Sequence, residues 1–401
     1  MAKTDFDLII VGGGMVGASL ACALKNSDLK IAIIEAFPAN SAQQPSYDDR
    51  SIALAYGSQR IFESIDLWPK LASHSTAITD IHVSDRGHFG ITRLSVQAEN
   101  VPALGQVITA RSMGQVLNKA IEQQANLEFI CPAKVTELSQ SPDYVAITLD
   151  DSRTLSAKLI VAADGGNSTI KRLLNLGSLE HDYKQTAITA NITPERAHNG
   201  KAFERFTDSG PIALLPMSDN RCSLVWTVKT GDEIEILSLS EQDFLSRLQE
   251  RFGYRLGKLL KVGQRNNYPL KLIQVDQPIQ HRVVLIGNAA HSLHPIAGQG
   301  FNLGLRDVAA LADVLVDNDG DCGDAHLLHD YSQWQQQDQD NVIDNTNILV
   351  KVFSNDNPII GHLRGAGLTL TDALPLAKHW LAQKSMGLDR KQPRLARGIK
   401  L

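Results

Sequence analysis

Three glycine-rich turns carry the residues that are best suited to binding a cofactor. The first turn, Gly12-Gly13-Gly14-Met15-Val16-Gly17, has the pattern GxGxxG and follows the apolar stretch FDLIIV. In this pattern the first glycine permits a tight turn, the second lets the backbone approach a pyrophosphate, and the third allows a helix and a strand to pack closely. Gly12, Gly14 and Gly17 therefore predict a dinucleotide site whose phosphates lie at a helix N-terminus.

An acidic residue stands where such a site needs one. Glu35 follows the apolar stretch KIAII and lies eighteen residues after Gly17 (35 − 17), near the usual spacing of about 20. Its carboxylate would bind a ribose hydroxyl and disfavour a 2′-phosphate. A glycine turn that serves only packing is the alternative, but strand, turn, helix and acidic residue coincide here. The motif alone does not separate NAD from FAD.

Two later turns also follow short apolar stretches that predict buried strands. One stretch ends in Asp164 and Gly165, and the other ends in Gly287 and Asn288. A flavin ribityl chain needs hydrogen-bonding groups near a glycine turn, which Asn288 could supply, and the isoalloxazine ring needs backbone without side chains beside it. The segment that follows contains Pro295, Gly298, Gln299, Gly300 and Asn302. A helix starting near Phe301 would direct its positive end at the reduced flavin, although a purely structural turn is the alternative.

Together the three turns resemble those of the group A flavoprotein aromatic hydroxylases, which carry GxGxxG, DG and GD motifs in this order. The resemblance covers about residues 1–350. It implies bound FAD and a transiently bound NAD(P)H, since no second GxGxxG follows the first. Asn288 replaces the aspartate of the GD motif, and Lys171 stands where the family often has arginine. Because asparagine keeps an acceptor oxygen and adds a donor, flavin binding should survive.

Further segments resemble the ubiquinone-biosynthesis hydroxylases within that group. They are DRSIAL (49–54), TAITDIHVSDRGHFG (76–90), AFERFTDSGPIALLPMSDNRCSLVW (202–226) and HPIAGQGFNLGLRD (294–307). The resemblance is greatest to members that act on a prenylated methoxyphenol. It implies that O2 forms a C4a-hydroperoxide on the reduced flavin, whose distal oxygen attacks the phenol ring. The alternatives are hydroxylation at another ring position or of another aromatic substrate, prenyl reduction, and a non-hydroxylating flavoprotein scaffold.

The resemblance also assigns flavin-side residues by motif position. Arg50 and Arg111 would lie beside the flavin, where Arg50 could neutralise it or attract a reduced nicotinamide. Surface salt bridges are the alternative for both arginines. Pro295 would lie near the reactive face of the flavin, and His294 could move a proton or contact the phenol. His291 and His294 could otherwise bind a metal, but no HExxH or further ligand cluster supports this, so we expect no metal site.

The elements around these turns predict an α/β fold. We expect a Rossmann-type FAD-binding domain, an inserted and mainly antiparallel β-sheet substrate domain and a helical C-terminal region, as in para-hydroxybenzoate hydroxylase. The expected parts are FAD-binding segments 1–180 and 276–320, a substrate domain 181–275 and a helical region 321–401. Strand-like segments between 183 and 275 favour the inserted sheet, with a helix starting at Ser240. Its substrate-binding face would hold Phe203, Leu214, Pro216 and Trp226, with core packing as the alternative.

The overall composition limits the kinds of partner and the cellular compartment that we expect for this protein. The 401 residues carry a net charge of −5 and no basic block, so we expect no nucleic acid partner. Four scattered cysteines without a CxxC motif indicate a reducing compartment. The N-terminus does not have the pattern of a signal peptide, and no apolar stretch reaches the length of about 18 residues that spans a bilayer. We expect a cytoplasmic protein, peripheral to the inner face of a membrane or within a ubiquinone-biosynthesis complex, that binds a prenylated phenol and O2.

Overall fold

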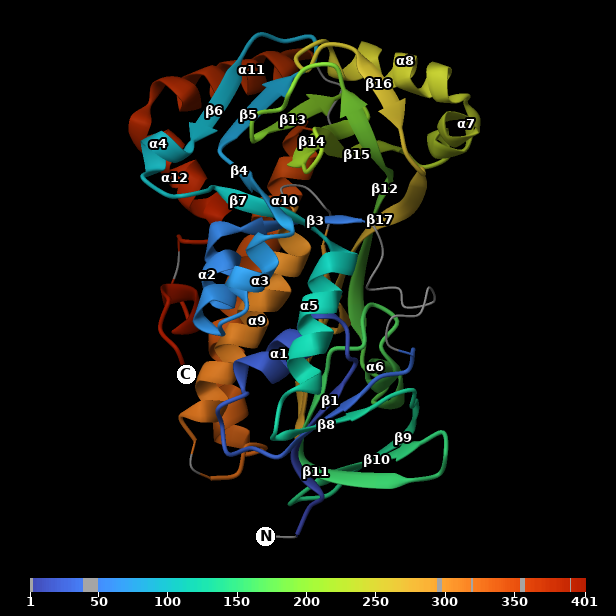
Figure 1. Ribbon diagram of the computed structural model, residues 1–401, viewed down its shortest axis with the longest axis vertical. Helices are drawn as coiled ribbons and strands as arrows, with labels where there is room; N and C mark the ends of the chain where they lie inside the picture. The colour runs from blue at the N-terminus through green and yellow to red at the C-terminus, as the bar shows by residue number, and fades with distance from the viewer. Residues whose placement is uncertain (1–2, 39–49, 294–297, 319, 354–357, 390) are drawn as a thin grey trace.

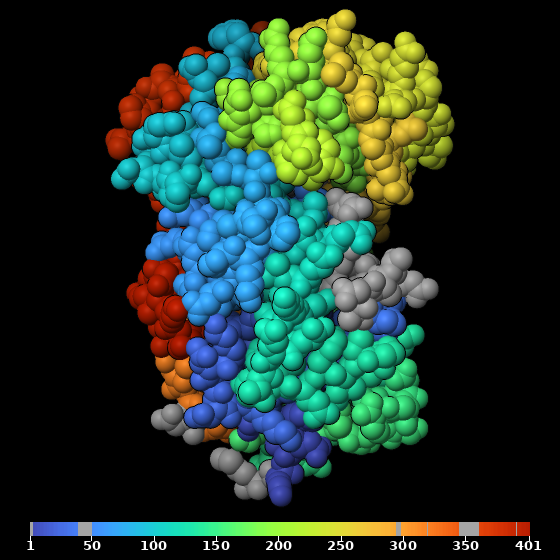
Figure 2. Space-filling model, viewed as in Figure 1, coloured from blue at the N-terminus to red at the C-terminus, as the bar shows by residue number. Residues whose placement is uncertain are grey.

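Two large sheets lie one above the other along the long axis of the molecule (Figure 1). The computed structural model describes residues 3–38, 50–293, 298–318, 320–353, 358–389 and 391–401. The space-filling view shows that the segment from α2 to α5 covers the middle of the molecule with its two ends, while its central part reaches up to the nine-stranded sheet (Figure 2). This arrangement confirms the expected fold class, a Rossmann-type part joined to a mainly antiparallel sheet and a helical C-terminal region.

An eight-stranded sheet forms the Rossmann-type part. Its order is β18-β19-β11-β1-β2-β8, with β9 and β10 continuing from β11. Its strands are β1 (Phe6–Val11), β2 (Ile31–Ile34), β8 (Leu127–Ile130), β9 (Val135–Gln140), β10 (Val145–Leu149), β11 (Thr154–Ala162), β18 (Ile279–Gln280) and β19 (Val283–Leu285). The parallel strands are continuous apolar runs because both of their faces are covered, and β1 has the bounds predicted for it.

Helices cover one face of this sheet. They are α1 (Met15–Ala23), α5 (Ala110–Glu122) and α9 (Gln299–Val316), and α6 (Thr169–Leu173) lies near β9. Leu8 and Ile10 of β1 pack against the helices, whereas Ile9 and Val11 pack into a second core with residues of β9, β10 and β11. Helix α9 begins two residues before its predicted start near Phe301.

A nine-stranded sheet forms the other part. Its order is β20-β17-β12-β15-β14-β13-β5-β6, and β16 pairs with β12. Its strands are β5 (Asp80–Asp85), β6 (Ile91–Ser95), β12 (Ser178–Pro194), β13 (Lys201–Thr207), β14 (Gly210–Met217), β15 (Arg221–Lys229), β16 (Leu259–Val262), β17 (Asn266–Val275) and β20 (His291–Ser292). Helices α7 (Asp232–Ser238) and α8 (Glu241–Phe252) lie on its outer side (Figure 1), and Ser240 caps α8 as predicted.

This sheet is larger than the segment predicted for it. Strands β5 and β6 come from a region that the sequence assigned to the first FAD-binding segment, and β5 pairs in parallel with β13. The sheet therefore extends beyond 181–275, because two strands far earlier in the chain complete its edge.

The remaining elements connect the two sheets and cover their sides. Between the sheets lie β3 (Ser51–Ala55), β4 (Ser75–Ile78) and β7 (Gly105–Thr109), with the short helices α2 (Tyr56–Ser64) and α3 (Trp68–Ala72). Helix α4 (Val96–Glu99) lies beside β6, at the edge of the nine-stranded sheet. The predicted C-terminal helices are α10 (Ala325–Phe353), α11 (Pro358–Ala373) and α12 (Pro375–Met386), and α11 packs on β5 and β6. In the described part of the chain, no helix is both long enough and apolar enough to cross a membrane.

Candidate cofactor site

The three predicted turns begin at one edge of the eight-stranded sheet. Val11 pairs with Ala162, and Ala162 pairs with Leu285 on the next strand. These are the last residues of β1, β11 and β19, whose parallel carboxyl ends point the same way. Open α/β sheets bind their ligands at this edge, so the fold brings together motifs that lie more than 100 residues apart in the sequence.

Two glycines of the first turn, Gly12 and Gly17, have no room for a side chain. Gly12 has a φ of +105°, and a Cβ atom added to it would lie 2.5 Å from the carbonyl oxygen of Ala163. A Cβ atom on Gly17 would lie 2.0 Å from the carbonyl oxygen of Gly12. Both glycines are therefore required by the close approach of backbone to backbone, which is the packing that the motif predicts.

Two helix N-termini face this edge without a capping side chain. Helix α1 begins after Gly14 and α9 begins after Gly298, and neither has a side-chain cap or an acidic residue in its first turn. By contrast, Thr109 caps α5 and Ser240 caps α8. The first backbone N–H groups of α1 and α9 are therefore suited to an external anion, which fits a pyrophosphate at α1 and the negative edge of a reduced flavin at α9.

Two buried carboxylates line the turns. Glu35 accepts hydrogen bonds from the backbone N–H groups of Gly13 (2.7 Å) and Phe37 (2.8 Å). Asp164 Oδ2 accepts hydrogen bonds from Thr169 (2.7 Å) and Ile170 (3.3 Å). Burial raises the pKa of both carboxyl groups.

One carboxylate oxygen at this edge is well placed to bind a ligand. Asp164 Oδ1 is buried and has no hydrogen-bond partner among the residues that the structure describes. A buried acceptor normally has a donor, and a hydroxyl of a bound cofactor would provide one. Gly165, the next residue, has a φ of +81° and open space where a side chain would lie, so the backbone there is accessible.

The two arginines expected beside the flavin are neighbours in space. Arg50 precedes β3 and Arg111 begins α5, and the pairing of β3 with β7 joins them through Ser51 and Thr109. The carbonyl oxygen of Arg50 accepts a hydrogen bond from the N–H of Ala110 (2.8 Å). Both arginine residues are exposed, so two positive charges from different parts of the chain lie at the N-terminus of α5.

The third glycine turn, at Gly287, is held by an aspartate that sequence reasoning did not single out. Asp307 on α9 accepts hydrogen bonds from the Gly287 N–H (2.9 Å) and from His291 Nε2 (2.6 Å). Gly287 has a φ of +56°, and Asn288 is exposed between buried neighbours. The turn thus presents the Asn288 side chain outward, while Asp307 fixes its backbone. The sequence signal for Asp307 was its place at the end of the segment HPIAGQGFNLGLRD, which resembles the hydroxylase family.

Asn302 has a different role from the flavin contact that was expected. Its Oδ1 accepts hydrogen bonds from Ala55 (2.8 Å) and Ser58 (2.7 Å), and its Nδ2 donates to Ala53 (2.9 Å) and Gly298 (2.7 Å). An amide has two donors and two strong acceptor positions, so this side chain is saturated within the protein. Asn302 therefore positions the Gly298 turn against β3.

The structure describes three of the five other residues that we expected at the site in this loop. Gln299 and Gly300 form the first turn of α9, and a side chain at Gly300 would meet no described atom within 4 Å. Gly298 adopts a φ of +62°, close to Ala53 of β3. His294 and Pro295 lie outside the described residues.

The four residues expected on the substrate face pack elsewhere. Phe203, Leu214 and Trp226 are buried in a core with residues of α8, and the rings of Trp226 and Phe244 lie 5.6 Å apart. Pro216 alternates with Leu214 along β14 and is also buried. These side chains belong to the face covered by α8, so core packing, the alternative interpretation, explains them.

The opposite face of the same strands looks toward the Rossmann-type part. Leu215 on β14 pairs with Ser223 on β15, and Ser223 Oγ forms a short hydrogen bond with Ser51 Oγ on β3. Ala213, Leu215 and Val225 on this face are only half-buried, although they lie in the middle of the sheet. Shifting by one residue along a strand changes the face, and this face lies next to the segment that begins at Arg50.

Comparison with known proteins agrees with this geometry. The profile of the FAD-binding domain family matches residues 5–346. The chain belongs to this family. A ubiquinone hydroxylase, UbiL, of Rhodospirillum rubrum is 36% identical, and the alignment covers 98% of this chain and 93% of the relative. The 3-demethoxyubiquinol 3-hydroxylase of Escherichia coli is 27% identical over 97% of this chain and 100% of the relative.

A solved structure supports the fold. The p-nitrophenol 4-monooxygenase of Pseudomonas putida superposes with a TM-score of 0.79 at 17% identity, covering 98% of this chain and 100% of that chain. With the family match and the relatives, this makes the protein an FAD-dependent monooxygenase of the group A type, with NAD(P)H as the reductant typical of the family. The resemblance found from the three motifs is thereby confirmed.

Proposed function

We propose that this monooxygenase hydroxylates a prenylated methoxyphenol, 2-octaprenyl-6-methoxyphenol, to the corresponding 1,4-benzoquinol during ubiquinone biosynthesis. The observation that carries the proposal is the half-exposed, largely apolar strand face at Ala213, Leu215 and Val225, which looks toward the FAD-binding part. An apolar aromatic substrate would rest on this face with its ring directed at the flavin. The names of the relatives, which are ubiquinone hydroxylases, support a substrate of this class.

The residues of the site have distinct tasks in this proposal. Gly12 and Gly14 let the pyrophosphate approach the N-terminus of α1, and Glu35 accepts a hydrogen bond from the ribose of the adenosine half. Asp164 Oδ1 accepts a hydrogen bond from a flavin hydroxyl, because it is a buried acceptor without a described partner. Asn288, which is exposed at the Gly287 turn, binds the ribityl chain.

Charge at the flavin is controlled by other groups. The N-terminus of α9 lies after Gly298 and stabilises negative charge on the reduced ring. Arg50 and Arg111 add positive charge, and we propose that Arg50 attracts the reduced nicotinamide. When bound, FAD accepts a hydride from NAD(P)H and activates O2 for transfer of one oxygen atom. The protein orients the phenol and excludes water, which would otherwise divert the oxygen to hydrogen peroxide.

The ring position follows from the chemistry of the substrate. A phenol oxygen donates electron density to its ortho and para carbons. In the proposed substrate the prenyl and methoxy groups occupy both ortho positions, so para is the activated carbon that remains open. His294 and Pro295 are proposed to lie near that carbon by motif position, His294 as a proton carrier.

The long prenyl tail of the proposed substrate limits where the enzyme can act. A tail of this kind must leave the site through an apolar path toward a lipid surface or a partner protein. We propose that the enzyme acts in the cytoplasm at the inner face of a membrane, alongside other ubiquinone-biosynthesis proteins. The FAD-binding segments 1–180 and 276–320, apart from β5, β6 and β20, and the helical region 321–401 would then support the substrate sheet.

Product analysis with a panel of prenylated phenols tests the assignment. The purified enzyme, FAD and NAD(P)H are incubated with methoxylated and unmethoxylated prenylphenols and with 3-demethoxyubiquinol, and the products are identified by mass spectrometry. The proposal expects preferred turnover of the methoxyphenol to a para-hydroxylated product. Preferred turnover of 3-demethoxyubiquinol would instead favour the activity for which the Escherichia coli relative is named. Reduction of a prenyl chain without oxygen incorporation would contradict hydroxylation altogether.

A further inference from the structure

One arginine of the nine-stranded sheet forms no ion pair with any residue that the structure describes. Arg205 lies on β13, on the same face as Phe203, and it is partly buried. Its Nε atom is buried and has no hydrogen-bond partner in the described part of the chain. Burial lowers the pKa of Arg205, and the charges of Arg255 and Arg86 lower it further. A buried donor and an uncompensated charge are both unfavourable unless something binds them.

A second arginine stands beside the first. Arg255 follows α8, and the only hydrogen bond of its guanidinium group in the described structure is a long one (3.5 Å) to the Phe252 carbonyl. Between the two arginines lies Gly253, with a φ of +87°. A Cβ atom built on Gly253 would lie 3.7 Å from Arg255 Nη1 and 3.9 Å from Arg205 Nη1. The two guanidinium groups therefore flank the same small volume, which a side chain at Gly253 would fill.

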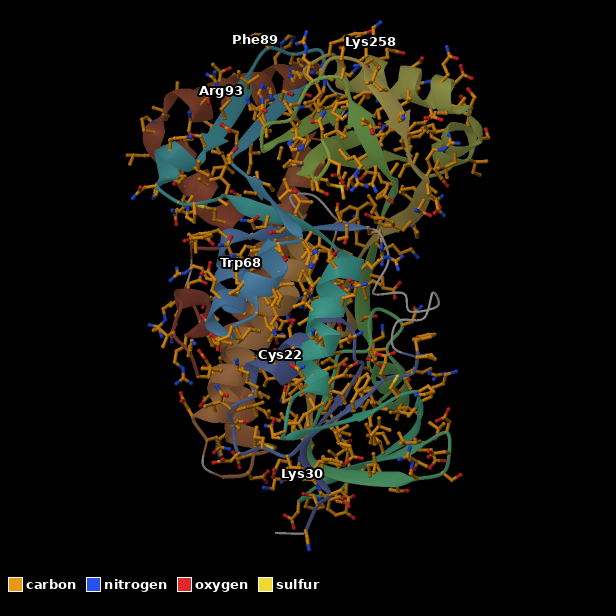
Figure 3. The ribbon with its side chains drawn as sticks, in the orientation of Figure 1. Cys22, Lys30, Trp68, Phe89, Arg93 and Lys258 are labelled. Carbon is orange, nitrogen blue, oxygen red and sulfur yellow. The ribbon has the colours of Figure 1, made fainter. Side chains whose placement is uncertain are left out.

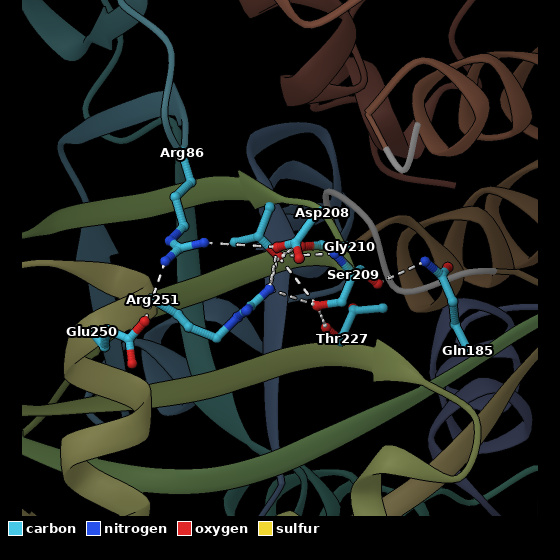
Figure 4. Close-up of polar contacts among 9 residues, drawn as sticks. Arg86, Gln185, Asp208, Ser209, Gly210, Thr227, Glu250 and Arg251 are labelled. Carbon is cyan, nitrogen blue, oxygen red and sulfur yellow. Dashed lines mark hydrogen bonds and ion pairs between the residues drawn. The ribbon is translucent and has the colours of Figure 1, made fainter. Parts of the chain in front are cut away.

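The neighbouring carboxylates are already paired with other arginines. Figure 4 shows Arg86 between Asp208 and Glu250, at 3.9 and 3.4 Å. Asp208 also forms an ion pair with Arg251. These acidic groups are thus held by Arg86 and Arg251, and neither forms an ion pair with Arg205 or Arg255 in the described structure.

A third carboxylate near Arg205 is equally engaged. Asp85 is buried and forms an ion pair with Arg364 of α11 at 2.9 Å, and His88 Nδ1 lies 3.3 Å from it. Burial is the largest cause of the lowered Arg205 pKa, and the attraction of Asp85, which raises that pKa, is a smaller effect than the repulsion from Arg255 or Arg86.

One more donor lies on the same face. His82 on β5 stacks obliquely near Phe203, with ring centroids 5.8 Å apart. Its Nδ1 atom is buried and has no partner among the described residues. Burial lowers the pKa of His82 and the charge of Arg255 lowers it further, while a hydrogen bond to its own backbone raises it; the net downward shift favours the neutral ring. His82 thus lies on the same face of the sheet as Arg205, because it pairs with Phe203, and it is near enough to Arg255 to be affected by its charge.

We propose that Arg205 and Arg255 form a binding site for a phosphate-type oxyanion, with His82 as an additional donor. Guanidinium groups match the geometry of phosphate oxygens through paired hydrogen bonds, and one anion between two guanidinium groups would remove their mutual repulsion. The site belongs to the part of the molecule that holds the nine-stranded sheet, since Arg205 lies on β13 and Figure 3 places Lys258, three residues after Arg255, at that end of the molecule. The phosphate could be free in solution or belong to a phospholipid headgroup.

Binding of inorganic phosphate to the FAD-loaded enzyme tests this site. Isothermal titration calorimetry and thermal melts are carried out with sodium phosphate, at an ionic strength matched with sodium chloride because salt screens such contacts. We expect saturable binding and a higher melting temperature for the unchanged protein. Arg205→Gln and Arg255→Gln should each weaken binding by about tenfold or more, the usual effect of losing a hydrogen bond to a charged group. Without phosphate, Arg205→Gln should melt no lower than the unchanged protein.

Arg247→Gln is the matched control, because Arg247 lies on α8 in an exposed ion pair with Glu235 (3.0 Å). Co-sedimentation with phosphatidylglycerol vesicles, compared with phosphatidylcholine vesicles, separates the two sources of phosphate. Binding of phosphate that is lost in Arg205→Gln supports a free anion, and binding only to phosphatidylglycerol that is lost in the same variant supports a headgroup. No saturable binding in either assay, or equal losses in Arg205→Gln and Arg247→Gln, would overturn the proposal.

Discussion

His291 Nε2 and Asp307 Oδ2 lie 2.6 Å apart, and both side chains are almost completely buried. The same Asp307 oxygen accepts the hydrogen bond of the Gly287 N–H at 2.9 Å. Asp307 belongs to α9, whereas Gly287 and His291 flank the turn that presents Asn288. The contact therefore joins the Gly287 turn to the helix whose N-terminus is proposed to face the flavin.

Removing Asp307 should loosen this turn. Asp307→Ala leaves His291 and the Gly287 N–H without their buried acceptor, so the free energy of unfolding should fall by about 3 kcal/mol. FAD should also dissociate more readily, because the position of Asn288 depends on the turn. Chemical denaturation and flavin fluorescence during dialysis measure the two effects. Asp317→Ala, which removes an exposed carboxylate at the end of the same helix, should change stability by less than about 1 kcal/mol. Equal losses in both variants would contradict this role of Asp307.

Gly14 in the first glycine turn should tolerate no branched side chain. Gly14→Val is expected to abolish FAD binding, since the side chain would occupy the space of the pyrophosphate at the start of α1. The unchanged protein should be yellow and release FAD, rather than FMN, on denaturation. Gly367→Ala on α11 is the control, because a Cβ atom there meets nothing within 4 Å. A Gly14→Val protein with normal flavin content would disprove the assignment of this loop.

Asn288 is expected to act through its acceptor oxygen. Asn288→Asp should keep FAD bound, since both side chains accept a hydrogen bond from a ribityl hydroxyl. Asn288→Leu should weaken binding by about 1–3 kcal/mol, because the cofactor hydroxyl is then buried without a partner. Fluorescence titration of the apoprotein with FAD gives the three dissociation constants. If all three are equal, the side chain at 288 does not contact the flavin.

Neighbouring leucines on β14 should behave differently because they lie on opposite faces of the sheet. Leu214→Ala should lower the free energy of unfolding by about 2–5 kcal/mol, as expected for a fully buried leucine, with little change in KM once folded. Leu215→Ala should change stability much less, since Leu215 is half-buried, and should raise the KM for the phenol. Thermal melts and steady-state kinetics of the two variants provide the comparison. The reverse pattern would place the substrate on the α8 side of the sheet.

The sequence predicted the cofactor site better than the substrate site. Glycine patterns are local, and each turn is defined by the strand immediately before it, so β1 and the convergence of Gly12, Asp164 and Gly287 were predictable. The pairing of β5 with β13 joins Asp80 to Lys201, and no local pattern identifies such a distant partner.

The sequence left open whether Phe203, Leu214, Pro216 and Trp226 contact substrate or pack in the core, for a related reason. Strand β14, GPIALLPM, is apolar at nearly every position, so alternation did not reveal which side faces the flavin. Only the packing of α8 distinguishes Leu214 from Leu215. Asp307 was overlooked because its partners, Gly287 and His291, are brought to it by the fold.

Turnover under isotope-labelled O2 tests the central claim most directly. The FAD-loaded enzyme is supplied with NAD(P)H, a prenylated methoxyphenol and labelled O2, and the quinol or quinone product is examined by mass spectrometry. The account predicts one labelled oxygen atom, placed para to the original hydroxyl, with NAD(P)H consumption stimulated by the phenol. Incorporation of oxygen from water, or consumption of NAD(P)H that yields only hydrogen peroxide with every phenol offered, would contradict it.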